Sequence, residues 1–145
     1  MPFRDEERAL LDMQAFAKLT TLMEDGAPQT TVMWYRRDGN TLRMIAPASA
    51  LKVRNIARDS RISVVIDNPS NGYHYVQIRG KADVVRDDAA ARAELRRIAA
   101  RYIADQADAY VDRLSRDPRV LLVIHPERVR LHAGSPPGGQ SSETD

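Results

Sequence analysis

Residues 49–55 (SALKVRN) hold the side chains of this sequence best suited to binding an anion. They combine a hydroxyl, an ammonium, a guanidinium and a carboxamide, carried by Ser49, Lys52, Arg54 and Asn55. The first N–H groups of a helix lack intrahelical partners, and the helix dipole is positive there, so a helix start attracts anions. Lysine adds a point charge, and arginine can bind a phosphate through two parallel hydrogen bonds. The segment therefore predicts a phosphate-type site at the start of a short helix.

Helical spacing separates one of these side chains from the other three. A helix turns by about 100° per residue, which places Ser49, Lys52 and Asn55 on one broad face and Arg54 on another. We expect Arg54 to bind a different part of a ligand or to pair with an acidic residue. A solvated helix with ordinary surface charges is the alternative for the whole segment.

A second candidate is an aromatic set that could flank a planar ring. It consists of Trp34, the only tryptophan, with Tyr35, Tyr73 and Tyr75. The alternative is packing in the core or in a dimer, where large aromatic side chains supply much of the buried area.

Other chemistries are excluded. The chain lacks the glycine-rich nucleotide motifs, H-E-x-x-H and G-x-S-x-G. Without cysteine it cannot form disulfides, iron–sulfur clusters or thiol nucleophiles. The three histidines, His74, His125 and His132, are scattered, so we expect no metal site.

Composition favours a small globular protein. A length of 145 residues suits one domain, and 22 basic against 20 acidic side chains disfavour a nucleic-acid binder. The bias of 19 arginines to 3 lysines suggests a GC-rich genome. Acidic residues near the start argue against a secretory segment, and the longest apolar run, 120–124, is too short to span a membrane. We therefore expect a cytoplasmic protein without a membrane partner.

The pattern of apolar residues predicts a mainly β chain with flanking helices. A leading helix over 6–17 precedes strands at 18–24, 28–36 and 41–46, and the turns at 25–26 and 37–40 predict a meander. A helix over 49–59, N-capped by Ser49, precedes strands at 61–67 and 73–85, the latter with bulges near Tyr75 and Gly80. Helices over 87–103 and 107–115 precede strands at 119–125 and 129–132.

These elements favour a single antiparallel barrel of about six strands with helices outside it. Consecutive early hairpins argue against a doubly wound parallel sheet. The folded domain is expected to cover residues 1–133, and the polar segment 134–145 (GSPPGGQSSETD) is expected to be a disordered tail.

Three short motifs, in order, resemble a known family. They are D-G-x-P-Q at 25–29, K-x-R-N-x-x-R-D at 52–59 and Y-x-x-I-x-G at 75–80. Together they resemble the pyridoxamine 5′-phosphate oxidase-like superfamily of split β-barrel flavin-binding proteins. Within it, the sequence is most similar to the actinobacterial branch that binds the deazaflavin coenzyme F-420 (the FDOR-B group). The resemblance covers roughly residues 10–132.

The resemblance implies a homodimer with two cofactor sites at the subunit interface. The cofactor phosphate would be held around Lys52, and the ring would lie against 30–34 and 45–47. Tyr73 and Tyr75 would come from the other subunit. The implied cofactor-binding residues are Gln29, Thr31, Val32, Met33, Trp34, Ile45, Ala46, Pro47, Ser49, Lys52, Arg54, Asn55, Tyr73 and Tyr75. The sequence departs from the family pattern at Ala46 and Ala50, where many relatives carry a hydroxyl and a basic residue.

The resemblance implies an oxidoreductase that transfers a hydride from reduced F-420 to an unsaturated organic acceptor. An FMN-dependent oxidase or reductase of the same fold, or a flavin-binding protein without turnover, are the alternatives. No catalytic residue is assigned. Tyr73 and Tyr75 are candidates for a general acid, but solvent could also protonate the product.

Overall fold

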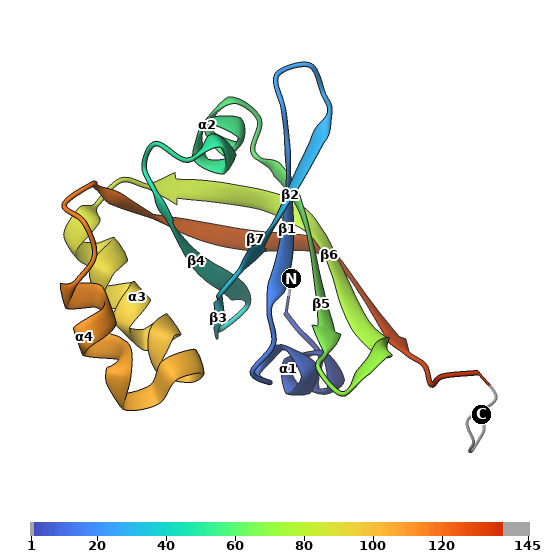
Figure 1. Ribbon diagram of the computed structural model, residues 1–145. Coiled ribbons are helices and arrows are strands. Elements are labelled where there is room, and N and C mark those ends of the chain that lie inside the picture. Colours follow the sequence, from blue (N-terminus) through green and yellow to red (C-terminus); the bar gives the residue numbers. More distant parts are fainter. Residues whose placement is uncertain (1, 138–145) are drawn as a thin grey trace.

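A curved sheet of seven antiparallel strands forms the centre of the computed structural model, which describes residues 2–137 (Figure 1). The strands are β1 (Ala17–Leu22), β2 (Pro28–Met33), β3 (Arg36–Asp38), β4 (Thr41–Pro47), β5 (Arg61–Asn68), β6 (Asn71–Val85) and β7 (Arg119–Ala133). The helices are α1 (Asp5–Leu11), α2 (Leu51–Arg58), α3 (Asp88–Ile103) and α4 (Ala107–Asp112), with a short 3-10 helix (Ala104–Gln106) before α4. This architecture confirms the predicted mainly β split barrel, with seven strands instead of about six.

The two edges of the sheet are neighbours in the sequence. The strand order is β2-β1-β5-β6-β7-β4-β3, so β2 and β3 lie at opposite edges. Only Trp34 and Tyr35 separate them, and three Cα–Cα steps span at most about 11 Å. The sheet must therefore curl until its edges almost meet, and we call this junction the seam.

Alternating side chains fill the interior of the barrel. Every second residue of β1, β4, β5 and β6 is buried, as expected for strands with one face toward a core. The core includes Leu19, Met44, Val64, Ile78 and Leu122. The alternation keeps the intervening side chains on the outer face of the sheet.

The helices lie outside the barrel at three places (Figure 1). α1 contacts β5 and β6 at the lower end in this view, and α2 contacts β1 and β6 at the upper end. α3 and α4 form a helical hairpin beside β4 and β7. The Asp87 side chain caps α3 by accepting a hydrogen bond from the Ala90 N–H at 3.0 Å. Among residues 2–137, no helix combines the length and the apolar character needed to cross a membrane.

Two early predictions are wrong. The helix expected over 6–17 ends at Leu11, because Ala17 already begins β1, which is hydrogen-bonded to strands on both sides. The strand expected over 28–36 is divided at the seam, since β2 pairs with β1 whereas β3 pairs with β4. The two hairpins therefore lie at opposite edges of the sheet and do not form a meander.

Three further boundaries differ. Ala50, not Ser49, is the N-cap of α2, and no side chain caps this helix. α4 ends at Asp112 instead of extending to residue 115. The strands expected at 119–125 and 129–132 form one strand, β7, because Pro126 lies at a bulge where its missing N–H is tolerated.

The predicted irregularities in β6 are confirmed. Strand pairing shifts between Asp67 and Asn68, opposite Tyr75, and again between Arg79 and Gly80. A Cβ atom at Gly80 would lie 2.0 Å from the His125 carbonyl oxygen, so close backbone approach requires glycine there. Within the expected tail, the Gly134 N–H donates to the Tyr73 carbonyl at 3.0 Å, and residues 138–145 lie outside the described residues.

Candidate functional site

A pocket of about 330 Å³ lies at the seam, between the barrel and the helical hairpin. The barrel contributes six lining residues that the sequence had singled out, namely Val32, Met33, Trp34, Ile45, Ala46 and Pro47. The helical hairpin and the segments that flank it contribute Leu95, Ile98, Tyr110, Leu114 and Arg119. The pocket thus has one strand wall and one helical wall, and both are mainly apolar.

Aromatic side chains build one side of this pocket. The Trp34 ring stacks on Tyr102 with centroids 4.9 Å apart and an interplanar angle of 5°. Tyr110 lies on Trp34 at 5.5 Å in a tilted arrangement. These contacts join the seam to the helical hairpin through the ring of the single tryptophan.

Buried ion pairs hold the helical wall against the barrel. Glu94 of α3 is buried and accepts two hydrogen bonds from Arg36 of β3, at 2.6 and 2.9 Å. Arg43 of β4 also approaches Glu94, at 3.8 Å. Bidentate carboxylate–guanidinium pairs are geometrically specific, so α3 is fixed in position relative to the β3–β4 hairpin.

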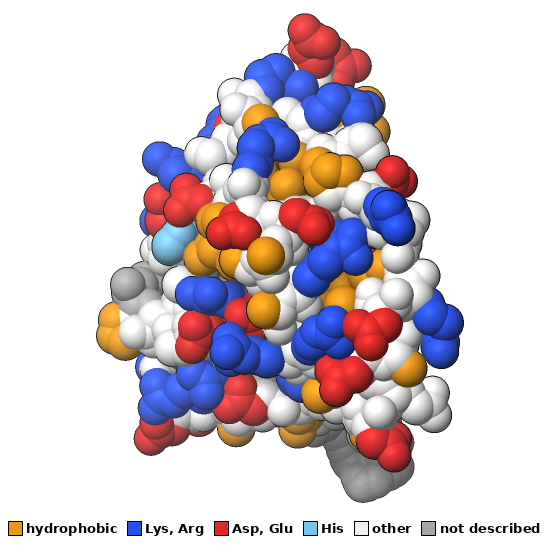
Figure 2. All heavy atoms as spheres, turned by 90° about the vertical axis from the view of Figure 1, so that its left-hand side faces the viewer, with side chains coloured by type: hydrophobic (Ala, Val, Ile, Leu, Met, Phe, Trp, Pro, Cys, Tyr) orange, Lys and Arg blue, Asp and Glu red, His pale blue; other side chains and the backbone are white. Residues whose placement is uncertain are grey.

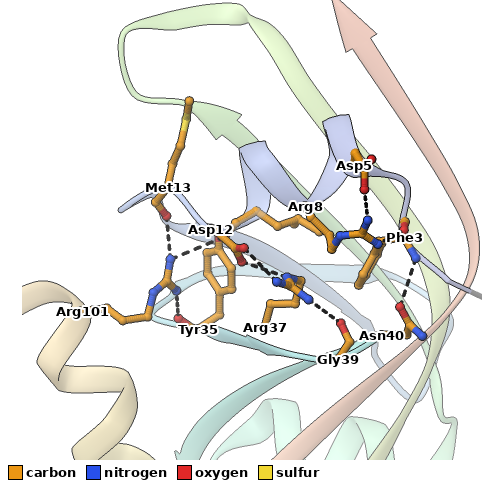
Figure 3. Close-up of polar contacts among 11 residues, drawn as sticks. Phe3, Asp5, Arg8, Asp12, Met13, Tyr35, Arg37, Gly39, Asn40 and Arg101 are labelled. Atoms are coloured by element: carbon orange, nitrogen blue, oxygen red, sulfur yellow. Dashed lines mark hydrogen bonds and ion pairs between the residues drawn. The ribbon is translucent and has the colours of Figure 1, made fainter.

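A second set of contacts fastens the end of α3 to the segment before β1 (Figure 3). The Arg101 guanidinium donates to the backbone carbonyls of Tyr35 and Met13, and it lies 4.7 Å from the centre of the Tyr35 ring. In the same view Asp12 and Arg37 form a bidentate pair with two contacts of 2.8 Å. Burial raises the pKa of the Tyr35 hydroxyl to about 12. This hydroxyl therefore stays protonated at physiological pH and donates to the Leu11 carbonyl at 2.6 Å.

Lys52 differs from these cations, because it has no ionic partner among the described residues. Its ammonium is half-buried and lies 3.0 Å from the sulfur of Met33, which lines the pocket. Burial lowers the pKa of Lys52 below its ordinary value of 10.5. A half-buried ammonium without a carboxylate favours an anionic ligand, because such a ligand would restore the lost solvation.

A polar line runs along the inner face of β2 toward α2. Thr31 carries a buried hydroxyl without a hydrogen-bond partner in the described chain. Next to it, Gln29 accepts a weak hydrogen bond from Thr21 at 3.4 Å. Asn55 is fully buried and donates to Thr21 at 3.0 Å. The structure therefore directs Asn55 to the barrel, where it fixes α2 on β1.

Ser49 and Arg54 lie on the exposed side of the α2 start. The Arg54 guanidinium donates to the Ser49 carbonyl at 2.6 Å, and neither side chain lines the seam pocket. Arg54 is exposed, and its partner is a backbone carbonyl instead of an acidic residue. The face expected for Ser49, Lys52 and Asn55 is not formed, because Ser49 is exposed, Lys52 is half-buried and Asn55 is fully buried.

Tyr73 and Tyr75 do not line the seam pocket within one chain. Tyr75 pairs with His132 near the end of β7, and their rings stack at 5.0 Å. Its neighbour Val76 lies in one row across the sheet with the pocket residue Met33, with β5 and β1 between them. Three strand spacings of about 4.8 Å therefore separate this part of β6 from β2.

The helical wall and Arg119 could not be identified from the sequence alone. Leu95 and Ile98 have the spacing of any buried helix face, and nothing in the sequence distinguishes a face over a pocket from one over a core. Arg119 is one of 19 arginines, and its position at the start of β7 becomes informative only in three dimensions. In the described part of the chain, no cluster of three or more potential metal ligands is present.

Figure 2 shows the side of the molecule that carries the helical hairpin. Acidic and basic side chains alternate across this face, with hydrophobic side chains visible between them. Ion pairs such as Arg96–Asp112 and Arg92–Asp88 account for part of this mixture. The face lacks the single-sign charge that favours nucleic acid.

An antiparallel barrel closed at a seam, with a pocket beside that seam, defines a flavin-binding class of split barrels. The model of the family "Pyridoxamine 5′-phosphate oxidase" matches residues 3–133. The chain therefore belongs to this family. A comparison with curated proteins gives no significant match.

Solved structures support the same assignment. An F420 reductase is 25% identical with a TM-score of 0.67, over 88% of this chain and 98% of that one. Conserved hypothetical protein Rv2991 from Mycobacterium tuberculosis is 24% identical with a TM-score of 0.73, over 96% and 94% of the two chains. General Stress Protein 26 from Bacillus anthracis is 15% identical with a TM-score of 0.65, over 86% and 89%. The last two are similar in fold alone.

Proposed function

We propose that this protein is an oxidoreductase that uses coenzyme F-420 to reduce an unsaturated organic acceptor. The observation that carries the proposal is the half-buried Lys52 ammonium without an ionic partner, next to an apolar pocket at the seam. The similarity to an F420 reductase supports the choice of a deazaflavin.

The residues present fit such a cofactor. Lys52 would hold an anionic group on the side chain of the cofactor. Thr31 offers an unpartnered hydroxyl to a polar atom of the cofactor ring. The strand wall formed by 32–34 and 45–47 would support the flat ring system. Ser49, Arg54 and Gln29 are proposed as outer contacts, and Asn55 as a positioning residue that holds α2 in place.

When bound in its reduced form, F-420 would supply a hydride to one carbon of the acceptor double bond. A proton must then reach the neighbouring carbon, and the cofactor leaves oxidised. No carboxyl group lines the seam pocket. We therefore assign this proton to solvent, while the chain's own residues orient the reactants and exclude water from the apolar walls.

An FMN-dependent oxidase or reductase is the second candidate. Membership of the pyridoxamine 5′-phosphate oxidase family favours it, because this fold binds flavins. The same phosphate-binding lysine and the same strand wall would serve FMN. A flavin-binding protein without turnover would also use these residues, but its purified form would bind cofactor without reducing any acceptor.

We propose that the functional unit is a homodimer in which Tyr73 and Tyr75 complete the partner's site. Two large side chains exposed on this fold, Val32 and Tyr73, support this assembly, since each would gain burial in an interface. Sedimentation of the purified protein at micromolar concentration should give the mass of two chains. A monomer that binds F-420 tightly would overturn the shared site.

Trp34 provides the test of the proposed function, because it is the only tryptophan and it lines the pocket. We expect titration with F-420 to quench its fluorescence with a micromolar or lower dissociation constant. FMN, titrated separately, should bind at least about tenfold more weakly. Tight FMN binding without F-420 binding would overturn the proposal in favour of the second candidate.

Cytoplasmic location and the lack of a nucleic-acid partner remain parts of this proposal. The near balance of 22 basic and 20 acidic side chains supports the second part. Duplex DNA should bind weakly at physiological salt, and a steep loss of affinity with added salt would contradict this expectation.

A further inference from the structure

Among residues 2–137, Arg119 is the only charged residue that lines the seam pocket. It lies at the start of β7, where that strand pairs with Pro47 at the end of β4. Its backbone N–H donates to Asp88 at 2.7 Å, so the main chain is held independently of the side chain. Its guanidinium donates to the Asp117 carbonyl at 2.7 Å and forms no ion pair within the described chain.

The Arg119 guanidinium forms no ion pair in the described chain, although the nearby Asp88 carboxylate offsets part of its charge. Other arginines, such as Arg54 and Arg128, also lack an ion pair there, so Arg119 is distinguished by its place in the lining of the pocket. The guanidinium groups of Arg36, Arg37, Arg92 and Arg96 each lie within 3.1 Å of a carboxylate. Arg119 keeps most of its five N–H donors free while it faces apolar and aromatic side chains. A guanidinium in such surroundings binds a carboxylate more strongly than one on an open surface, because solvent competes less.

The walls around Arg119 restrict the shape of a ligand. Tyr110 and Trp34 contribute aromatic side chains that pack on each other, and Leu95, Ile98 and Leu114 add aliphatic surface. The whole pocket, strand wall included, has a volume of about 330 Å³, near the lower end for small-molecule sites, which run from about 300 to 1,000 Å³, so its helical side takes only a small ligand. A flat, conjugated molecule uses such a space best, because aromatic side chains can stack on it.

From these observations we propose that the helical side of the seam pocket binds the acceptor, and that this acceptor is a flat, conjugated organic acid whose carboxylate pairs with Arg119. The role of this ligand as an acceptor rests on the proposed function. The anion site itself does not depend on any cofactor. Lys52 and Arg119 then have separate roles. Lys52, next to Met33, would pair with the cofactor phosphate, and Arg119 would pair with the carboxylate of the acceptor. An α,β-unsaturated acid would carry both the double bond to be reduced and the carboxylate to be held.

Binding of two matched probes tests this inference without turnover. Trans-cinnamate and trans-cinnamamide share a flat conjugated skeleton and differ in charge. Calorimetric titration of the purified full chain should show cinnamate binding at least about tenfold more tightly than cinnamamide, as expected for a charge-assisted pair. Arg119→Gln should abolish this preference and leave cinnamamide binding unchanged.

Arg116→Gln is the matched control, because Arg116 is an exposed arginine three residues away that does not line the pocket. This variant should keep the full preference for cinnamate. The fold of Arg119→Gln is checked by its thermal unfolding midpoint, and the wild-type preference tests the site even where that variant fails to fold. Equal binding of the two probes to the wild type, or binding of neither, would overturn the proposal.

The experiment also separates this inference from the proposed function. If the wild type does not bind F-420 but still prefers cinnamate to cinnamamide, the cofactor assignment is wrong and the anion site stands. Competition between F-420 and cinnamate would show that both occupy the strand wall, and it would overturn the acceptor assignment. A drop of tenfold or more in F-420 affinity in Arg119→Gln would have the same consequence.

Discussion

Two groups of cations on this barrel differ in how completely the chain satisfies them. In the anchor cluster, formed by Arg36, Arg37 and Arg101 with their partners, each guanidinium meets a carboxylate or several backbone carbonyls. Figure 3 shows Arg37 and Arg101 of this cluster. At the seam, Arg119 lines the pocket and Lys52 contacts the lining residue Met33, and neither forms an ion pair within the described chain.

The difference indicates which charged residues stabilise the fold and which are available to bind a ligand. Leaving a cation half-buried and unpaired costs free energy, so a chain gains little stability from such a residue. Paired cations can be explained by architecture alone. Among the cations without an ion pair in the described chain, Arg119 lines the seam pocket and Lys52 contacts the lining residue Met33. A ligand with anionic groups would pair with both.

Glu94→Gln should have the largest effect on this contrast. Removing the buried carboxylate takes away the bidentate partner of Arg36 and leaves Asp38 as the remaining acidic neighbour of Arg36 and Arg43, which should lower the free energy of unfolding by about 3 kcal/mol. Urea denaturation measures the change. Glu127→Gln, at an exposed carboxylate without an ion pair in the described chain, should change stability by less than about 0.5 kcal/mol. Equal effects of the two substitutions would remove the anchor role.

Lys52→Ala should lower ligand affinity without a comparable loss of stability. We expect F-420 to bind about tenfold more weakly, because a charge-assisted contact is lost. The free energy of unfolding should change by less than about 0.5 kcal/mol, because the substitution breaks no ion pair of the described chain.

Lys18→Ala should behave in the opposite way. Lys18 is paired with Asp67 at 2.5 Å on the partly exposed outer face, so its removal should cost about 0.5 kcal/mol of stability and leave F-420 affinity unchanged. Parallel fluorescence titrations and urea curves of the two variants give both quantities. If Lys52→Ala and Lys18→Ala bind F-420 with the same affinity, Lys52 is an ordinary surface charge and does not bind the cofactor.

Asp12→Asn should have a similarly small effect on stability, and this effect should depend on pH. The hydrogen bonds from Arg37 hold the pKa of the Asp12 carboxyl below its ordinary value of 3.8. The stability from this pair is therefore fully present above pH 3.8 and is lost as pH falls through the lower folded-state pKa. Because Asp12 is half-exposed, solvent screening limits the loss in the variant to about 0.5 kcal/mol at neutral pH.

The pH dependence of unfolding measures this pair directly. The difference between wild type and Asp12→Asn should shrink below about pH 4, whereas Asp105→Asn, at an exposed position, should follow the wild type throughout. A difference that stays constant down to pH 2 would mean that Asp12 acts through its shape and not through its charge.

The sequence predicts this fold well where local patterns decide it. The turn at Asp25-Gly26 and the bulge at Gly80 both depend on glycine, because Gly26 has a positive φ and Gly80 has no room for a Cβ atom. The sequence fails where distant pairing overrides local preference, as at residues 12–16, where a turn and irregular backbone lead into β1 in place of the helix that Met13 and Phe16 suggested.

For the candidate site, the strand wall could be predicted and the helical wall could not. A resemblance to known proteins pointed to residues 32–34 and 45–47, and the structure brings them together in one pocket. Leu95, Ile98 and Arg119 carry no local signal, because their role depends on how the helical hairpin packs across the seam. Tyr73 and Tyr75 mark a further limit, since within one chain neither of them lines the seam pocket.

The link between the two sheet edges has a consequence for design. Trp34 and Tyr35 make no ladder pairing of their own, yet their length sets the distance between β2 and β3 and thereby the width of the pocket. One residue inserted between them would lengthen the link by about 3.8 Å at most without removing a strand from the sheet. The width of the pocket at the seam thus depends on the number of residues in this link, and that number can be changed one residue at a time.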